Sequence, residues 1–408
     1  MRTRRTPPAL AMGLANLPYG MFGGLALMTV PQLLAGRGVP QPIIASITAA
    51  AMIPTFCAFL LSPILDVRFS RRSYTFFFGA LTAVMALVAL TRTDLASLTV
   101  ALIVGFLCAN LNYAALGGWL GSVVEPGDEG KLGAGFTIGN AAGFGLGAMA
   151  FITLYRLLPQ PLGAVAIAST FAAPLLWLMW IPAEARTRRT ARESFGALAH
   201  DLLALVKRPA VLRLLLIFCL PASSFALTNT LGGLGGEFAT SEAMVAIVAA
   251  VGVTAAGIAG SLLVPGLIKR VPPPYLYLMI GVTGAFFTLS VLGLPRTPLV
   301  FAAALIGQNV FQSAAFTTEA TLIFRSIGEA NPLAATQFAF LQAATAFPIT
   351  YMQMVDGQGY RAAGLVGTFV TDAGLSLLAC AILLPIVIYW RQRERGESVV
   401  LTPAELPA

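Results

Sequence analysis

Residues Ile181–Arg213 read IPAEARTRRTARESFGALAHDLLALVKRPAVLR, a charged stretch in a chain that is otherwise almost entirely apolar. Two hydrophobic blocks of similar length lie on either side of it. Seven of its residues are Arg or Lys, so the stretch predicts a basic loop that joins two membrane-embedded halves. The predicted boundaries are residues 1–181 for the first half, 182–210 for the linker, 211–390 for the second half and 391–408 for a tail.

Within the linker, apolar residues recur at helical spacing. Phe195, Leu198, Leu202 and Leu205 are three or four positions apart, while charged residues fall on the remaining faces. This pattern is typical of an amphipathic helix that lies on a membrane surface. A solvated linker without such a helix is the alternative.

The composition places the chain among membrane proteins. Of its 408 residues, 57% are hydrophobic and 10% are charged, and the mean hydropathy is +0.83. Soluble domains carry about 25% charged residues. The net charge of +8 comes from residues in short loops, which excludes a nucleic-acid-binding surface as its explanation and instead indicates membrane orientation.

A bilayer-spanning helix needs about 20 mostly apolar residues. Runs of that length predict twelve spans, six on each side of the linker, and hence an all-α membrane protein of two six-helix halves. The predicted spans are 10–34, 41–65, 73–91, 96–122, 132–156, 162–181, 211–235, 242–268, 275–294, 298–324, 333–355 and 363–390.

The loops predict which way these spans cross. With both termini in the cytoplasm, 20 of the 25 Lys and Arg residues fall on the cytoplasmic side. Positive residues are enriched in cytoplasmic loops. The sequence therefore predicts a multi-pass protein of the bacterial inner membrane with both termini in the cytoplasm.

The two halves also repeat short motifs. Leu17-Pro18 matches Leu220-Pro221, Pro63–Arg68 matches Pro265–Arg270, and Leu132–Gly135 matches Leu333–Thr336, all at offsets of 201 to 203 residues. Three pairs at nearly one offset indicate a duplicated six-helix unit. Parallel repeats of this kind form the major facilitator fold, which binds its cargo near mid-membrane between the halves.

Small residues recur every fourth position in three spans, the first of which is the second span with Ser46, Ala50, Pro54, Ala58 and Ser62. The fifth span carries Gly135, Gly139, Gly143 and Gly147, and Ala335, Ala339 and Ala343 lie in the eleventh. Because glycine has no Cβ atom, a neighbouring helix backbone can approach closely. These rows predict tight helix–helix seams, either static or able to slide.

Three segments resemble the AmpG-like branch of the major facilitator superfamily, which includes muropeptide permeases and siderophore importers. They are Leu17–Gly20 (LPYG), Ser62–Asp66 (SPILD) with Arg71-Arg72, and Ala334–Leu341 (AATQFAFL). The resemblance covers nearly the whole chain and implies proton-coupled import across the inner membrane. One departure is in the fourth span, where Asn110–Trp119 lacks the acidic residues of muropeptide permeases.

Asp66 ends the second span and is followed by Arg68, Arg71 and Arg72. An acid and several bases at a cytoplasmic helix end predict a latch between the halves. A carboxylate that simply faces water is the alternative.

Two acids lie inside predicted spans, where a charge costs at least about 2.5–3.5 kcal/mol. Glu319 shares a face of the tenth span with Gln308 and Gln312, and Asp372 lies near the middle of the twelfth. Both are candidates for proton coupling. For Glu319, the alternative is an ion pair with Arg325; for Asp372, it is a structural hydrogen bond.

Uncharged polar residues gather in the first, fourth, seventh and tenth spans, which line the cavity in this fold. Their amides, hydroxyls and phenol rings suit a polar, hydrogen-bonding cargo, although bonds between helices compete for the same groups. The candidates are Asn16, Tyr19, Asn110, Asn112, Tyr113, Ser224, Thr228, Asn229, Gln308, Asn309 and Gln312.

Motifs of enzymes and metal sites are missing from the sequence. The chain has one His, and Cys57, Cys108, Cys219 and Cys380 have no metal-ligand spacing. We therefore expect a monomeric secondary transporter without cofactor, metal or nucleic-acid partner, which imports a polar solute with protons through the lipid bilayer. Export of drugs or metabolites is the first alternative, and a sensor or scaffold that no longer transports is the second.

Overall fold

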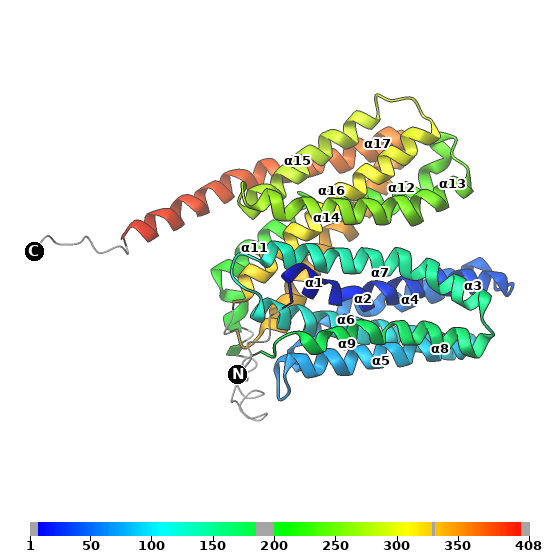
Figure 1. The fold of residues 1–408 in the computed structure, drawn as a ribbon. Helices are drawn as coiled ribbons and strands as arrows, with labels where there is room; N and C mark the ends of the chain where they lie inside the picture. Colours follow the sequence, from blue (N-terminus) through cyan, green and yellow to red (C-terminus); the bar gives the residue numbers. More distant parts are fainter. Residues whose placement is uncertain (1–6, 185–199, 202, 329–330, 401–408) are drawn as a thin grey trace, which may run out of the picture.

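The structure is a computed structural model that describes residues 7–184, 200–201, 203–328 and 331–400, with side chains to residue 393. The regular elements in these ranges are helices. Figure 1 shows them as two bundles, one from each half of the chain, with α17 running beyond the second bundle toward the C-terminus.

The first bundle contains six spans. The first is an almost continuous helix, Ala9–Gly36, which includes α1 (Ala9–Gly13), α2 (Leu17–Gly24) and α3 (Val30–Gly36). The next five are α4 (Gln41–Cys57) with a short extension to Leu60, α5 (Arg71–Thr91), α6 (Leu95–Val123), α7 (Glu129–Leu157), and α8 (Gln160–Thr170) followed by α9 (Ala172–Trp177).

The second bundle begins with α11 (Pro209–Cys219), α12 (Leu227–Leu231) and the 3-10 helix η6 (Gly232–Phe238). It continues with α13 (Glu242–Ile247), α14 (Val253–Ile268), α15 (Pro273–Val291), α16 (Pro298–Ile327) and α17 (Ala334–Val400).

Ten helices in the described ranges are long and apolar enough to cross a membrane. The twelve predicted spans fit these ten because α17 holds two of them and the seventh is broken. In α17, Ala363 and Gly364 leave the helical conformation, and Gly364 has φ of 60°. The residues before and after them contact each other, so α17 is a hairpin of two arms.

Helix starts follow local capping rules. Ser70 accepts a hydrogen bond from the Ser73 backbone N–H at the start of α5, and Asp94 accepts one from Ser97 N–H at 2.7 Å at the start of α6. A side-chain oxygen at this position satisfies one of the donors that the first helical turn leaves free. The boundaries of these spans are therefore encoded in short segments of sequence.

The predicted continuous seventh span, 211–235, is wrong. The chain leaves the helix between Cys219 and Leu227, because Pro221 has no N–H to donate and its ring clashes with the preceding turn. Phe225, with φ of 46°, adopts a conformation that is unusual for a residue other than glycine. The result is a broken span between α11 and α12.

The free carbonyl groups of the broken span receive donors from neighbouring helices. Tyr351 Oη donates to Cys219 O at 3.0 Å, and Ser376 Oγ donates to Ala222 O at 2.7 Å. Gln312 Nε2 lies 3.3 Å from Phe225 O. Irregular backbone is tolerated at membrane depth where protein groups satisfy it, as they do here.

The hydrophobic core shows where the bundles meet. One buried cluster contains Trp119 and Phe136 of the first bundle together with Phe218, Phe324 and Phe338 of the second. These residues lie toward the end of the molecule where α5, α7 and α17 begin, which we call the terminal end. Toward the opposite end, each bundle has a separate core of its own.

Of the linker, residues 185–199 and 202 lie outside the described part of the structure, including Phe195, Leu198 and Leu202 of the predicted amphipathic helix. Residues 200–201 and 203–207 are helical. Leu205 is 1% exposed and packs into the cluster at the terminal end, whereas Leu203 is 62% exposed. This part of the linker therefore packs against the protein by one face.

The predicted glycine row of the fifth span packs against the first span. A Cβ atom on Gly143 would lie 2.4 Å from Leu17 O, and one on Gly135 would lie 2.0 Å from Leu10 O. Backbone atoms cannot move aside as the end of a side chain can. The close approach of α7 to α1 and α2 therefore requires glycine at these positions.

We predict that Gly143→Ala destabilises the protein by about 1–3 kcal/mol, because overpacking forces backbone shifts. Thermal unfolding of the purified protein in detergent measures this. Gly266→Ala is the control, since Gly266 lies inside α14 with no atom within 4 Å of its virtual Cβ. A Gly143→Ala protein that melts at the same temperature as the control would contradict the close contact.

Candidate functional site

A cavity lies between the bundles, with a volume of about 180 Å³. Helices α2, α4, α6 and α7 of the first bundle and α16 and α17 of the second contribute its lining. The polar residues that line it are Asn16, Tyr19, Thr55, Asn110, Tyr113, Thr137, Asn140, Glu319, Gln342 and Thr345. Apart from Glu319, this polar lining consists of amides, hydroxyls and phenols.

Four of the predicted cavity residues therefore line the cavity: Asn16, Tyr19, Asn110 and Tyr113. Tyr19 stacks on Tyr113 with ring centroids 4.4 Å apart. Asn16 is 1% exposed; its Nδ2 donates to Phe136 O at 3.0 Å, and its Oδ1 has no protein partner. Asn16 thus lies at the cavity wall with one acceptor that the protein leaves without a donor.

The other predicted cavity residues do not line it, and most of them hold helices together. Asn112 Nδ2 donates to Thr75 O at 2.7 Å, and Gln308 Nε2 donates to Thr288 Oγ1, so these amides tie α6 to α5 and α16 to α15. Gln312 and Thr228 bond each other, with Gln312 Nε2 2.6 Å from Thr228 Oγ1, and Asn309 donates to Leu305 O of its own helix. Ser224 is buried in the broken span, and Asn229 is exposed.

Sequence patterns missed Asn140 and Gln342, which lie in the fifth and eleventh spans rather than in the four spans where we expected the cavity. Gln342 Nε2 donates to the Tyr113 hydroxyl across the boundary between the bundles. Gln342 follows Ala335 and Ala339 at helical spacing. A polar residue that continues a row of small residues was the signal available in the sequence.

Glu319 lies at the cavity wall in the second bundle and is 4% exposed. Its carboxyl group forms a side-chain hydrogen bond with Tyr277 of α15. The alternative partner, Arg325, instead has its Nε 3.6 Å from Glu129 Oε2 of α7. Glu319 is thus an ionisable group within reach of a solute, held by a phenol rather than by a cation.

An aromatic layer closes the cavity toward the terminal end. The ring of Phe338 packs against Tyr113, Phe136 and Phe324, with centroids 5.2, 5.5 and 5.6 Å away. Gly117 makes room for it, since a Cβ there would lie 2.5 Å from the Phe338 ring. Because these rings come from both bundles, the cavity cannot open to the terminal end without their separation.

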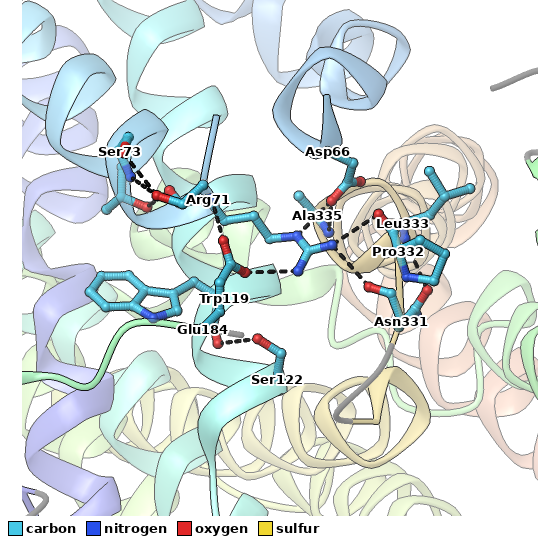
Figure 2. A network of polar contacts seen from close by, with 12 residues as sticks. Asp66, Arg71, Ser73, Trp119, Ser122, Glu184, Asn331, Pro332, Leu333 and Ala335 are labelled. Atoms are coloured by element: carbon cyan, nitrogen blue, oxygen red, sulfur yellow. Dashed lines mark hydrogen bonds and ion pairs between the residues drawn. The ribbon is translucent and has the colours of Figure 1, made fainter. Parts of the chain in front are cut away.

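A polar latch lies beyond this layer, at the terminal end itself (Figure 2). Asp66 of the first bundle accepts hydrogen bonds from the backbone N–H groups of Ala335 and Thr336, at 3.2 and 2.8 Å, and from Thr336 Oγ1 at 2.6 Å. A carboxylate at a helix N-terminus is stabilised by the free donors and the helix dipole. Asp66 thus links the first bundle to the start of α17.

Arg71 completes the latch. Its Nε lies 2.6 Å from Asp66 Oδ1, its Nη1 lies 2.8 Å from Glu184 Oε2, and its Nη2 donates to the carbonyl oxygens of Asn331 and Pro332, both at 2.9 Å (Figure 2). The side chains of Asp66, Arg71 and Glu184 are all at most 10% exposed. Glu184, the first acid of the charged linker, was missed as a latch residue.

The other two predicted latch residues point elsewhere. Arg68 lies over the Phe69 ring at 5.0 Å, and Arg72 lies over the Trp119 ring at 5.6 Å and donates to Met179 O. The latch therefore consists of Asp66, Arg71 and Glu184 on the first bundle and of the segment from Asn331 to Thr336 on the second.

Asp372, the second predicted proton-coupling residue, does not line the cavity. It lies in the second arm of α17, is 5% exposed, and accepts a hydrogen bond from the backbone N–H of Leu227, the first residue of α12. It therefore contacts the broken seventh span rather than the solute path.

The profile of the Major Facilitator Superfamily matches residues 12–352. The chain belongs to this superfamily. It is a multi-pass membrane transporter and not an enzyme. No curated protein matches it in sequence.

Solved structures of transporters share the fold. The human organic anion transporter MFSD10 (TETRAN) superposes with a TM-score of 0.69 at 18% identity, covering 93% of this chain and 100% of that one. The proton:xylose symporter XylE, bound to 6-bromo-6-deoxy-D-glucose, has a TM-score of 0.67 at 12% identity, with 93% and 95% covered. A bacterial homologue of the iron transporter ferroportin, in an outward-facing state, has a TM-score of 0.63 at 14% identity, with 92% and 98% covered.

We predict that Asp66→Asn separates the two bundles at the terminal end. Removing one member of a buried ion pair costs about 3–5 kcal/mol, which is more than a hundredfold in the closed population. Spin labels on Lys131→Cys and Lys269→Cys, two exposed positions at this end in opposite bundles, measure the separation in a Cys57→Ser background. A longer distance should appear in Asp66→Asn.

Asp94→Asn is the matched control for this measurement. Asp94 is an acid that caps a helix, as Asp66 does, but it is exposed and contacts its own bundle. Identical distance distributions for Asp66→Asn and Asp94→Asn would show that Asp66 does not hold the bundles together.

Proposed function

We propose that the protein imports a small polar solute together with protons across the bacterial inner membrane, by alternating access of the cavity between its two bundles. The observation that carries this proposal is Glu319, a buried acid at the wall of a cavity whose other polar lining residues are uncharged. A carboxyl group in this position can take up a proton and release it as its surroundings change.

The cavity restricts the class of solute. Its volume of about 180 Å³ is below the roughly 300–1,000 Å³ typical of pockets for drug-sized ligands. Lys, Arg and His are absent from its described lining, so an anionic group would have no counter-charge. The cavity therefore favours a neutral sugar or amide group, either as a small solute or as the part of a muropeptide-like or siderophore-like cargo that it holds.

The latch and the proposed orientation support an assignment of the conformation, and this conformation is compatible with import. With both chain termini in the cytoplasm, the terminal end is the cytoplasmic end, where the latch and the aromatic layer join the bundles. The structure then corresponds to an outward-facing transporter with its cytoplasmic side closed. A solute that enters from outside and binds the cavity would next require release of the Asp66–Arg71 latch.

Export of a cationic solute is the second candidate, and Glu319 also favours it. An ionised Glu319 would be the counter-ion of a cation in a cavity that has no basic residue in its described lining. Drugs and metabolites with an amine fall in this class.

Thermal unfolding in detergent, with a panel of compounds, tests the solute class. A ligand at about 100 times its dissociation constant stabilises the folded protein by roughly 2.7 kcal/mol. We expect stabilisation by anhydromuropeptides, siderophores or simple sugars. Stabilisation by cationic drugs alone would favour export, and stabilisation by acetyl-CoA would contradict the proposed neutral solute.

Glu319→Gln should abolish the response of transport to a pH gradient, because glutamine cannot carry the proton but keeps the size of the side chain. Uptake of the stabilising compound into proteoliposomes, with and without an inward-directed proton gradient, measures this. Solute binding should persist in the variant. Glu242→Gln, at an exposed acid in α13, is the control. Gradient-driven uptake that persists in Glu319→Gln would exclude Glu319 as the proton carrier.

A further inference from the structure

The hairpin of α17 brings two buried carboxyl groups together. Asp356 lies about two turns before the reversal at Ala363 and Gly364, and Asp372 lies about two turns after it. The two arms contact each other at this level, where Thr368 Oγ1 donates to Asp356 O at 3.4 Å. Asp356 is 1% exposed and Asp372 is 5% exposed. The predicted eleventh span ends at residue 355 and so leaves Asp356 in a loop, whereas the structure continues the helix and buries it.

Asp356 has no hydrogen-bond partner for either of its carboxyl oxygens. The carboxyl group of Asp372 is close enough to interact with it electrostatically. Asp372 differs in one respect, since it accepts the backbone N–H of Leu227. An unsatisfied buried polar group costs about 1–3 kcal/mol, and more if it is charged. The two acids therefore have unequal environments, one with a donor and one without.

Most of the charged groups on the elements around the pair have partners elsewhere, and Arg361 of α17 itself is exposed. Arg213 of α11 lies over the Trp390 ring. Tyr277 of α15 bonds Glu319 of α16, and Arg325 of α16 is paired with Glu129. Glu237 of η6 bonds Tyr360 and Arg296 at the surface. The sequence of α12, LTNTL, has no ionisable residue.

Two buried carboxylates without a counter-cation are strongly destabilising in the low dielectric of a membrane protein, so the pair requires a cation. A metal ion would need about six oxygen ligands. Most of the buried neighbours of the pair on the same helices are instead apolar: Leu227 and Leu231 of α12, and Met352, Leu365 and Phe369 of α17. The hydroxyl of Thr368 already donates to Asp356 O. These surroundings fit a proton and not a metal ion.

We propose that Asp356 and Asp372 bind one proton as a pair, with Asp356 as the carboxylic acid and Asp372 as the carboxylate held by Leu227. The proton comes from a hydronium ion: one of its O–H bonds breaks as an O–H bond forms on a carboxyl oxygen of Asp356, and a water molecule is left behind. The site lies outside the solute cavity, and it is distinct from Glu319.

The pair contacts the broken seventh span at the point where that span meets the cavity helices. Leu227 begins α12, and Gln312 of α16 bonds Phe225 O and Thr228 Oγ1 on either side of it. Glu319 lies seven residues further along α16, on the same face as Gln312. Loss of the proton would place two negative charges next to Leu227. Their repulsion would destabilise the contact between Asp372 and the start of α12. The proposal rests on the proposed proton coupling and gives the transporter a second proton site besides Glu319.

Infrared difference spectroscopy of the purified protein tests proton binding without any solute. Protonated carboxyl groups and carboxylates absorb at different frequencies, and isotope-labelled aspartate shifts the Asp bands alone, so Glu319 does not interfere. We expect one labelled protonated-carboxyl band per molecule near neutral pH, which disappears as the pH is raised. Asp356→Asn should lack the band, because the remaining Asp372 has its own donor. Asp372→Asn should retain it.

Asp94→Asn is the matched control and should leave the band unchanged. The absence of a protonated Asp band from the native protein at any pH would overturn the proposal, whether or not the variants fold. Survival of the band in Asp356→Asn would also overturn the assignment. Loss of the band when Na⁺ replaces K⁺ would show a sodium site instead. Each of these outcomes leaves the transport role of Glu319 to its own uptake experiment.

Discussion

The absence of water from the interior of a membrane determines most of this structure. Backbone N–H and C=O groups must find partners within the protein there, and helices provide them within a single segment. Where the seventh span departs from the helix between α11 and α12, the requirement passes to side chains of α16 and α17. Tyr351, Ser376 and Gln312 each donate to a carbonyl group of the break. The irregular segment is thus held by the elements that carry the proposed site.

The same constraint explains where the charged residues lie. Asp66, Arg71 and Glu184 are nearly buried, but each is satisfied by another charge or by a helix N-terminus. Satisfied in this way, a charged group can hold two bundles together and yet separate from its partners when water enters. Glu319 and the pair of Asp356 and Asp372 have fewer partners. Acids with few partners are suited to bind and release protons, whereas charged groups that are fully paired are suited to form a latch.

The latch and the aromatic layer close one end of the cavity by different interactions. The rings around Phe338 exclude water by packing, whereas the contacts of Asp66 with the start of α17 depend on direction and charge. The segment Ala334–Leu341 (AATQFAFL) contributes to both. Ala335 and Thr336 donate to Asp66, Gln337 bonds Asn331 at 2.7 Å and Ser326, and Phe338 fills the aromatic layer. The residues of this segment are therefore used for contacts at the boundary between the bundles.

The sequence by itself determined the all-α membrane class, the two halves and nearly all of the spans. These depend on runs of apolar residues, on capping residues such as Ser70 and Asp94, and on the repeated motifs, all of which are local. It also identified Asp66, Arg71 and Glu319, because a charge in or beside an apolar run stands out. The break in the seventh span could not be predicted from Leu220-Pro221, because the matching Leu17-Pro18 lies in the first span without breaking it. There, Pro18 lies in the first turn of α2.

Only the tertiary structure decided which polar residues face the cavity. Asn16 and Asn112 look alike in sequence, yet one lines the cavity and the other bonds Thr75 of the neighbouring helix. It also decided the partners of Glu319 and the pairing of Asp356 with Asp372. The physical reason is that these choices depend on how helices far apart in the sequence are rotated and how deeply they overlap. That is set by the packing of whole helices and not by any one segment.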